Sequence, residues 1–254
     1  MEKYGRFAAI SILAVFCIFA LSGCSGLRER SEEKNLSKAQ REFAEQFAQI
    51  SSSSLAPVYA PLAEQIVTDY ALAETEGIGI DLGGGNGTLI VELAKRTRAM
   101  HWILADINPR YFSYAAQLAA DAGVGHRVGM IAADANMLPF RDNYADIIVS
   151  RGSFQFWGDL SVSFAEVNRV LKPGGIAYIG RGLPRNLPVE TARVVRFGRD
   201  GNGGSNPKYD LEKTAETLVS TMNDLNITDF TIHRPSPPGS DGINYGIWLE
   251  WHKH

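Results

Sequence analysis

The chain has 254 residues and a formal net charge of −3 at pH 7, with 45% hydrophobic and 21% charged residues, which suits one globular α/β domain with an appendage. The slightly acidic balance lacks the basic stripe of nucleic-acid-binding proteins, so we expect no nucleic-acid partner. Both cysteines, Cys17 and Cys24, lie in the first 24 residues, and the five histidines are scattered, so no disulfide framework, catalytic thiol or metal site is predicted for the rest of the chain.

The N-terminal residues are typical of a membrane-targeting segment. Lys3 and Arg6 precede a nearly unbroken apolar run of 15 residues over 7–21. That run is shorter than the roughly 20 residues of a transmembrane helix and has the length of a signal-peptide core. It ends in LSGC at 21–24, which resembles the lipobox of bacterial lipoproteins, whose cysteine is lipidated after cleavage in front of it. The resemblance implies lipidation of Cys24. A plain signal anchor with an incidental cysteine is the alternative.

The chain divides into three predicted parts. Residues 1–23 are the signal peptide. Residues 24–54 are highly charged, then weakly amphipathic, and end in four serines, which favours a lipid-anchored polar tether. Residues 55–254 are the folded domain.

Helical and strand periodicities alternate along the folded domain. Predicted helices cover 55–73, 88–95, 111–122, 160–171 and 211–225; predicted strands cover 78–82, 102–105, 128–133, 145–150, 176–180, 230–233 and 245–251. This alternation favours an α/β, Rossmann-like, doubly wound and mostly parallel sheet of seven strands. The last two strands have no helix between them, so we expect an antiparallel terminal hairpin. We expect Pro173, Gly174 and Gly175 to stop the helix over 160–171.

The stretch DLGGGNG at 81–87 follows the first predicted strand. Doubly wound sheets bind nucleotides at such a turn, because glycine lets the backbone approach a ligand and the helix N-terminus adds donors. The glycines fall at 83, 85 and 87, and position 88 is Thr88, so the GxGxxG dinucleotide fingerprint is not met. No Gly-Lys-Ser/Thr of a phosphate-binding P-loop follows either.

Carboxylates end the next two predicted strands. Asp106 ends the second strand, where a carboxylate can accept hydrogen bonds from both hydroxyls of a ribose. Asp134 follows the third strand, where it can accept one from an adenine amino group. The alternative for both is a solvated carboxylate at a strand end.

Four stretches in order resemble the successive motifs of the class I S-adenosylmethionine-dependent methyltransferases, in the small-molecule, quinone-methyltransferase-like branch. They are IDLGGGNGT, LADINPRYFSYA, AADANMLPFRDNYADIIVSRGSFQFW and EVNRVLKPGGIAYI, and the match extends over about residues 57–250. The resemblance implies S-adenosylmethionine as the cofactor. By position it implies these cofactor-binding residues: Asp81 near the amino group; Gly83, Gly85 and Gly87 around the methionine moiety; Asp106 on the ribose; Ile107 against the adenine; Asp134 and Ala135 at the adenine edge; Arg151 facing methionine and substrate; and Tyr59 closing over the cofactor.

Methyl transfer from a sulfonium depends largely on positioning, so we predict no catalytic side chain. A domain without cysteine argues against cytosine C5 and thiol-based arsenite methylation, and SRGSFQFW lacks the Asn-Pro-Pro-Tyr pattern used on nucleic-acid amino groups. We expect a small, apolar methyl acceptor, favoured by membrane attachment and by Phe154, Phe156 and Trp157, which are either core residues or a substrate wall. Residues 199–209 are either a connector or a substrate lid, and Trp248 and Trp251 are expected to be packing residues.

The signal peptide and the cofactor point to opposite sides of a membrane, because S-adenosylmethionine is cytoplasmic. Three hypotheses remain: a tethered methyltransferase with unusual cofactor access, a non-catalytic module that binds S-adenosylmethionine or a related adenosine ligand, or an enzyme held on the cytoplasmic face by an uncleaved N-terminal segment. The intact set of acidic residues favours an enzyme.

Overall fold

The computed structural model describes residues 55–199 and 209–254, which belong to one compact unit, Glu42–His254. The predicted signal peptide, the lipidation of Cys24 and the tether over 24–54 lie outside the described residues. Within the described part, no helix is long and apolar enough to cross a membrane.

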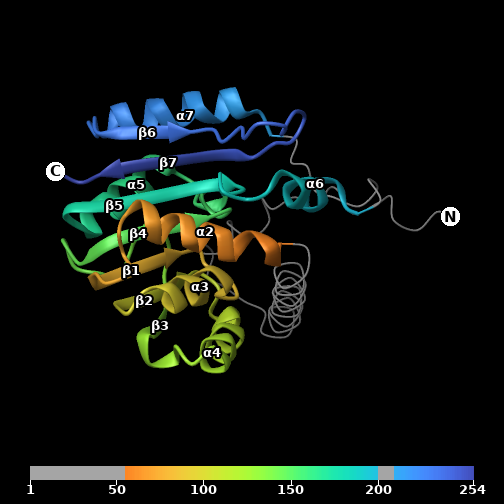
Figure 1. Ribbon diagram of the computed structural model, residues 1–254. Helices are drawn as coiled ribbons and strands as arrows, with labels where there is room; N and C mark the ends of the chain where they lie inside the picture. The colour runs from red at the N-terminus through yellow and green to blue at the C-terminus, as the bar shows by residue number, and fades with distance from the viewer. Residues whose placement is uncertain (1–54, 200–208) are drawn as a thin grey trace, which may run out of the picture. The chain divides into compact units, whose positions relative to one another are not determined.

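A seven-stranded sheet in the order β3-β2-β1-β4-β5-β7-β6 forms the centre of the domain (Figure 1). Strands β1 to β5 are parallel, and β7 runs antiparallel to both β5 and β6. The predicted mostly parallel sheet with an antiparallel terminal hairpin is therefore confirmed. The strands are β1 Glu76–Leu82, β2 Ala99–Asp106, β3 Val128–Ala132, β4 Ala145–Arg151, β5 Leu171–Gly182, β6 Phe230–His233 and β7 Gly246–His252.

Helices cover both faces of this sheet. Among the described residues, the α-helices are α2 Ala56–Asp69, α3 Thr88–Arg96, α4 Phe112–Asp121, α5 Leu160–Val170, α6 Val189–Phe197 and α7 Leu211–Asp224. The 3₁₀ turns in the same part of the chain are η2 Pro109–Tyr111, η3 Gly125–Arg127 and η4 Phe154–Phe156. Side chains alternate along each strand between two cores: Ile147 and Val149 pack with α2, α3 and α4, and Ile148 packs with α5 and α7. The compact unit Glu42–His254 contains the whole seven-stranded sheet, so we expect the fragment 27–254 to fold by itself.

The predicted end of α5 is confirmed to within one residue, and the Pro-Gly-Gly stretch begins three residues beyond it. The helix ends at Val170, and β5 begins at once with Leu171, which is fully buried and pairs with Ala145. The next pair in the register is Ile147 with Ile176, so residues 172–175 form an irregularity inside the strand. Burial of Leu171 thus starts the strand ahead of the proline, and the glycines allow the bulge.

Helix α6 was not predicted from the sequence. Its buried residues are Ala192, Val195 and Arg196. An arginine on the buried face weakens the apolar periodicity on which sequence prediction of a helix depends.

The two C-terminal tryptophans are packing residues, as predicted. Trp248 is 1% exposed and stacks on Tyr178, with ring centroids 4.9 Å apart. Trp251 is 0% exposed, and its ring centroid lies 5.4 Å from that of Phe164. They secure β7 on opposite faces of the sheet beside β5.

Candidate functional site

The predicted cofactor residues meet at one edge of the sheet. Strands β3, β2, β1 and β4 are neighbours and parallel, so their carboxyl ends lie side by side (Figure 1). Asp106 is the last residue of β2 and Arg151 the last of β4. The glycine loop follows β1 directly, and Asp134 lies two residues beyond β3. In doubly wound sheets, ligands bind outside this edge.

The glycine loop is built from left-handed backbone. Gly83, Gly85 and Gly87 have φ values of 68°, 55° and 81°. A Cβ on Gly83 would lie 2.4 Å from Ser153 Oγ, and one on Gly87 would lie 2.6 Å from Ala115 Cβ. Packing within the protein therefore already requires glycine at these two positions, whereas Gly85 is required by its backbone conformation.

Asp106 ties the glycine loop to the end of β2. Its Oδ2 accepts a hydrogen bond from Gly85 N at 2.9 Å, and its Oδ1 accepts one from Asn108 N at 2.8 Å. Burial raises the pKa of Asp106, and the two backbone amides oppose that rise. A carboxylate has about four acceptor positions, so Asp106 can still accept hydrogen bonds from a ligand.

Asp81 lies beneath the loop. The residue is 0% exposed, and neither side-chain oxygen has a hydrogen-bond partner among the described residues. Burial, and then the negative charge of Asp106, raise the pKa of Asp81 to about 7, against a smaller opposing effect of the Ile90 amide. A Cβ on Gly84 would lie 2.6 Å from Asp81 Oδ2, so the loop covers the carboxylate in this conformation.

The loops after β2 and β3 present apolar side chains next to Asp134. Asp134 Oδ1 accepts hydrogen bonds from the backbone and side-chain nitrogens of Asn136, and Ala135 is buried. Ile107 and Met137, in the loops that follow the adjacent strands β2 and β3, are 64% and 76% exposed. Sequence reasoning named Ile107 and missed Met137, whose only signal was its position shortly after Asp134.

Tyr59 and Arg151 contact each other across two elements. Arg151 Nη1 lies 3.4 Å from the Tyr59 hydroxyl on α2, and the guanidinium carbon lies 5.0 Å from the centre of the ring. Arg151 Nε also donates to the Gly182 carbonyl of β5 at 3.2 Å. This bridge fixes the guanidinium at the end of β4.

Two further arginines that sequence reasoning missed lie near Arg151. The guanidinium of Arg181, on β5, lies 4.0 Å from the ring centre of Tyr209, whose hydroxyl donates to the Arg181 carbonyl at 2.6 Å. Arg196 donates from Nε to the Asn244 carbonyl at 2.8 Å. Burial lowers the pKa of Arg196 to about 10; Tyr209 opposes this, and the charges of Arg151 and Arg181 add to it.

Neither Arg151 nor Arg181 forms a salt bridge with a carboxylate of the described residues. No signal in the sequence marked Arg181, since it lies at the end of an apolar strand. Tyr209 was noted only as the last residue of the 199–209 loop.

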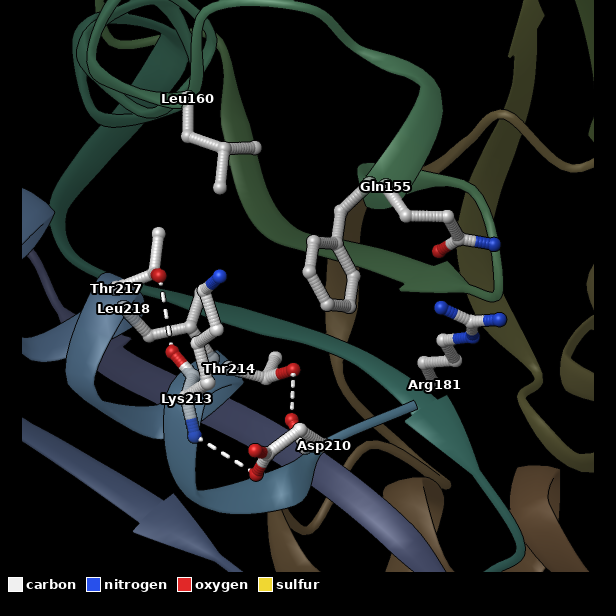
Figure 2. A pocket seen from close by; sticks show the side chains of 9 residues that line it. Gln155, Leu160, Arg181, Asp210, Lys213, Thr214, Thr217 and Leu218 are labelled. Atoms are coloured by element: carbon white, nitrogen blue, oxygen red, sulfur yellow. Dashed lines mark hydrogen bonds between the residues drawn. The ribbon is translucent and has the colours of Figure 1, made fainter. Parts of the chain in front are cut away.

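A pocket of about 290 Å³ opens beside Arg181 (Figure 2). Figure 2 shows Gln155 and Arg181 on one side of it and Asp210, Lys213 and Thr214 of the α7 region on the other. Phe154 and Trp157 are buried core residues, Phe154 also lines the pocket, and Phe156 is exposed. That these aromatics form a substrate wall stays a prediction. The lining residues are Phe154, Gln155, Leu160, Arg181, Asp210, Lys213, Thr214, Thr217 and Leu218.

This edge fits S-adenosylmethionine. The buried Asp81 carboxylate, which has no hydrogen-bond partner among the described residues, would be neutralised by a nearby ammonium group. Gly85 has left-handed backbone and no side chain of its own to hinder a ligand, and Asp106 has acceptor capacity for a ribose. The exposed Ile107 and Met137 offer apolar surface to a flat ring.

Comparison with known proteins supports the same family. A family model described as a methyltransferase domain matches residues 80–179. A solved structure from Methanococcus maripaludis, assigned as an S-adenosylmethionine-dependent methyltransferase, is 30% identical with a TM-score of 0.70, and the match covers 84% of this chain and 93% of that one. A second such structure, from Aquifex aeolicus, has a TM-score of 0.59 at 16% identity over 82% of this chain and 97% of its own, which shows the fold alone.

A curated relative matches a shorter segment. The ubiquinone/menaquinone biosynthesis C-methyltransferase UbiE of Vibrio cholerae is 37% identical over 97 residues, or 38% of this chain. That segment spans only 37% of the length of UbiE. With the matched motifs, the sheet order and the Methanococcus structure together, the chain belongs to the class I S-adenosylmethionine-dependent methyltransferases.

Proposed function

We propose that the domain binds S-adenosylmethionine over the ends of β1, β2 and β3 and transfers its methyl group to a small, apolar acceptor. The observation that carries this proposal is the hydrogen bond from Gly85 N to Asp106 Oδ2 at 2.9 Å. It joins the loop that approaches the cofactor to the carboxylate that accepts from the ribose, so one site is assembled from two strand ends.

The proposed roles follow the positions of the side chains. Asp106 accepts from the ribose, Asp134 and the Ala135 backbone hold the adenine edge, and Ile107 packs on the adenine ring. Gly83, Gly85 and Gly87 form the loop around the methionine moiety. Asp81 acts from beneath that loop as a negative charge for the amino group. Arg151 and Tyr59 close the site on the side of β4.

The chemistry requires positioning more than a reactive side chain. When bound, S-adenosylmethionine supplies a methyl group on a positively charged sulfonium. The contribution of the chain is to hold the acceptor in line with that methyl group and to exclude water, and good alignment alone accelerates such reactions greatly. We therefore propose no general base among the described residues.

The alternative is a non-catalytic module that binds S-adenosylmethionine or a related adenosine ligand. The complete acidic set at the sheet edge disfavours a decayed site. Calorimetric titration of the fragment 27–254 tests the binding step: we expect S-adenosylmethionine to bind and NAD not to bind. Equal or tighter binding of NAD would overturn the proposal. A radiolabelled methyl-transfer screen over small apolar acceptors then tests turnover.

We also propose that Cys24 is lipidated and attaches the domain to a membrane. The supporting pattern is Lys3 and Arg6, the apolar run over 7–21 and LSGC at 21–24. Two or three acyl chains hold a protein stably on a membrane, whereas one chain does so only marginally. Cys24→Ala should leave an unprocessed precursor without acyl mass in intact mass spectrometry of the membrane fraction. A wild-type chain that retains Met1 would instead favour an uncleaved segment with the domain on the cytoplasmic face.

A further inference from the structure

The pocket beside Arg181 has both apolar and charged walls. Phe154, Leu160 and Leu218 supply apolar surface, and Arg181 and Lys213 supply positive charge. The Asp210 carboxylate also lines the pocket, but it accepts a hydrogen bond from Lys213 N at 3.1 Å and caps α7. The lining therefore suits a ligand with an apolar body and an acidic end.

The pocket adjoins the glycine loop through Ser153. Ser153 Oγ donates to the Leu82 carbonyl at 3.1 Å, directly before the loop, and the next two residues, Phe154 and Gln155, line the pocket. Gln155 Nε2 donates to the Gly152 carbonyl at 2.7 Å, while its buried Oε1 has no partner among the described residues. That oxygen can accept a hydrogen bond from a ligand hydroxyl.

Positive charge accumulates at this end of the sheet. Arg151, Arg181 and Arg196 lie close enough to influence one another, and no described carboxylate forms a salt bridge with the first two. A sulfonium cofactor at the same edge would add a further cation. Because Arg151 and Arg181 have no carboxylate partner among the described residues, an anionic second ligand would offset their charge and bind more favourably than a neutral one.

We infer that the methyl acceptor carries a carboxylate or phosphate group, which Arg181 binds while the apolar body of the acceptor packs on Phe154, Leu160 and Leu218. This inference rests on the proposed function and narrows its acceptor from an apolar molecule to an apolar acid. Arginine suits the role because its planar fork donates two parallel hydrogen bonds to either anion. The Tyr209 ring, 4.0 Å from the Arg181 guanidinium, helps to hold it in place.

Three probes with one ring system test the inference. They are 1-naphthoate, 1-naphthyl phosphate and uncharged 1-naphthol, titrated calorimetrically into the fragment 27–254 saturated with S-adenosylhomocysteine. We expect at least one of the two anions to bind about tenfold or more tightly than naphthol. Whichever anion binds more tightly identifies the acidic group.

Variants assign that preference to Arg181. Arg181→Gln should remove the preference for the anion while leaving the Kd of naphthol unchanged, and Arg181→Lys should retain part of it. The matched control is Arg193→Gln, which removes the same charge from an exposed position on α6 and should change nothing. Unchanged binding of S-adenosylhomocysteine shows that each variant is folded.

Two outcomes overturn the inference. In one, no probe binds or naphthol binds as tightly as the anions, although S-adenosylhomocysteine is bound. In the other, Arg181→Gln keeps the preference for the anion. If S-adenosylhomocysteine itself does not bind to the wild type, the proposed function fails instead, and the two failures are thereby distinguished.

Discussion

The carboxyl edge of the sheet has two halves of opposite charge. The half over β3, β2 and β1 carries Asp81, Asp106 and Asp134. The last two accept hydrogen bonds from backbone amides of the loops at this edge. The half over β4 and β5 carries Arg151 and Arg181: the guanidinium of Arg151 contacts the Gly182 carbonyl and the Tyr59 ring, and that of Arg181 contacts the Tyr209 ring. The first half is suited to a cofactor with a positive charge and sugar hydroxyls, the second to an anionic acceptor.

The largest expected effect is that of Gly85→Val, which should strongly weaken cofactor binding at the acidic half and leave the basic half unaffected. Gly85 has φ 55°, a conformation in which a β-branched residue is strained, and its amide hydrogen bond to Asp106 fixes the loop. We expect the Kd for S-adenosylmethionine to rise by about a thousandfold, or roughly 4 kcal/mol. Calorimetry measures this rise, and thermal unfolding shows whether the fold is retained.

The control for that variant is Gly123→Val. Gly123 has φ 71°, and a Cβ there would meet no atom within 4 Å. The variant carries the same backbone strain at the end of α4, away from the site, and should leave the Kd unchanged. Normal cofactor binding by Gly85→Val would mean that the loop is only a turn.

A second test concerns the buried charge in the acidic half, through Asp81→Asn. The fold raises the pKa of Asp81 from 3.8 to about 7, so the folded state holds this proton more tightly than the unfolded state. The stability that Asp81 contributes is therefore full below about pH 4 and lost as the pH rises to 7. At pH 8, without ligand, the variant should be more stable than the wild type by roughly 2–3 kcal/mol.

Denaturant unfolding between pH 4 and 8 measures that difference. The matched control is Asp146→Asn at the start of β4, because the Asp146 carboxylate accepts hydrogen bonds from Lys172 Nζ at 2.8 Å and from Ile78 N at 2.7 Å. Its removal should destabilise the protein at pH 8 instead. A difference between wild type and Asp81→Asn that does not vary with pH would contradict the raised pKa.

A third test is Asp106→Ala. It removes the acceptor of the Gly85 and Asn108 amides and the proposed ribose acceptor at once. We expect S-adenosylmethionine binding to weaken by about 2 kcal/mol, because hydrogen bonds to a charged group are worth roughly 1.5–3 kcal/mol. Binding of 1-naphthoate at the basic half should change less than twofold in the same titrations. A parallel loss of both would show that the two halves form one coupled site.

The acidic half was largely predictable from the sequence, because it is local. Asp81 and Asp106 each fall at the end of a strand or within one, beside a glycine loop of fixed spacing, so pattern and topology place them together. The sequence did not reveal how deeply Asp81 is buried: nothing in DLGGGNG indicates that its carboxylate lies beneath Gly84 and has no hydrogen-bond partner among the described residues. That property depends on the packing of the completed domain.

The basic half was largely unpredictable, because its parts come from distant segments. Arg181 ends a strand that reads as apolar, Arg196 interrupts the buried face of α6, and Tyr209 follows a loop. Helix α6 was missed for the same reason. Tertiary contacts bring these residues together, and the local periodicity of the sequence does not predict such contacts.

The smallest expected effect is that of Tyr209→Phe in the basic half. The substitution keeps the ring that lies 4.0 Å from the Arg181 guanidinium and removes only the hydroxyl that donates to the Arg181 carbonyl at 2.6 Å. One hydrogen bond of this kind contributes about 1 kcal/mol, so the Kd of the preferred anionic probe should rise by roughly threefold to fivefold. Tyr209→Leu, which also removes the ring, should add a further loss of about 0.5–1 kcal/mol from the cation–π contact.

Neither variant should change the Kd of S-adenosylhomocysteine, since no residue of the acidic half contacts Tyr209 in the hydrogen bonds and ring contacts of the described residues. If Tyr209→Leu binds the anion as tightly as the wild type, Arg181 does not depend on Tyr209 for its position, and the guanidinium is oriented by the strand alone.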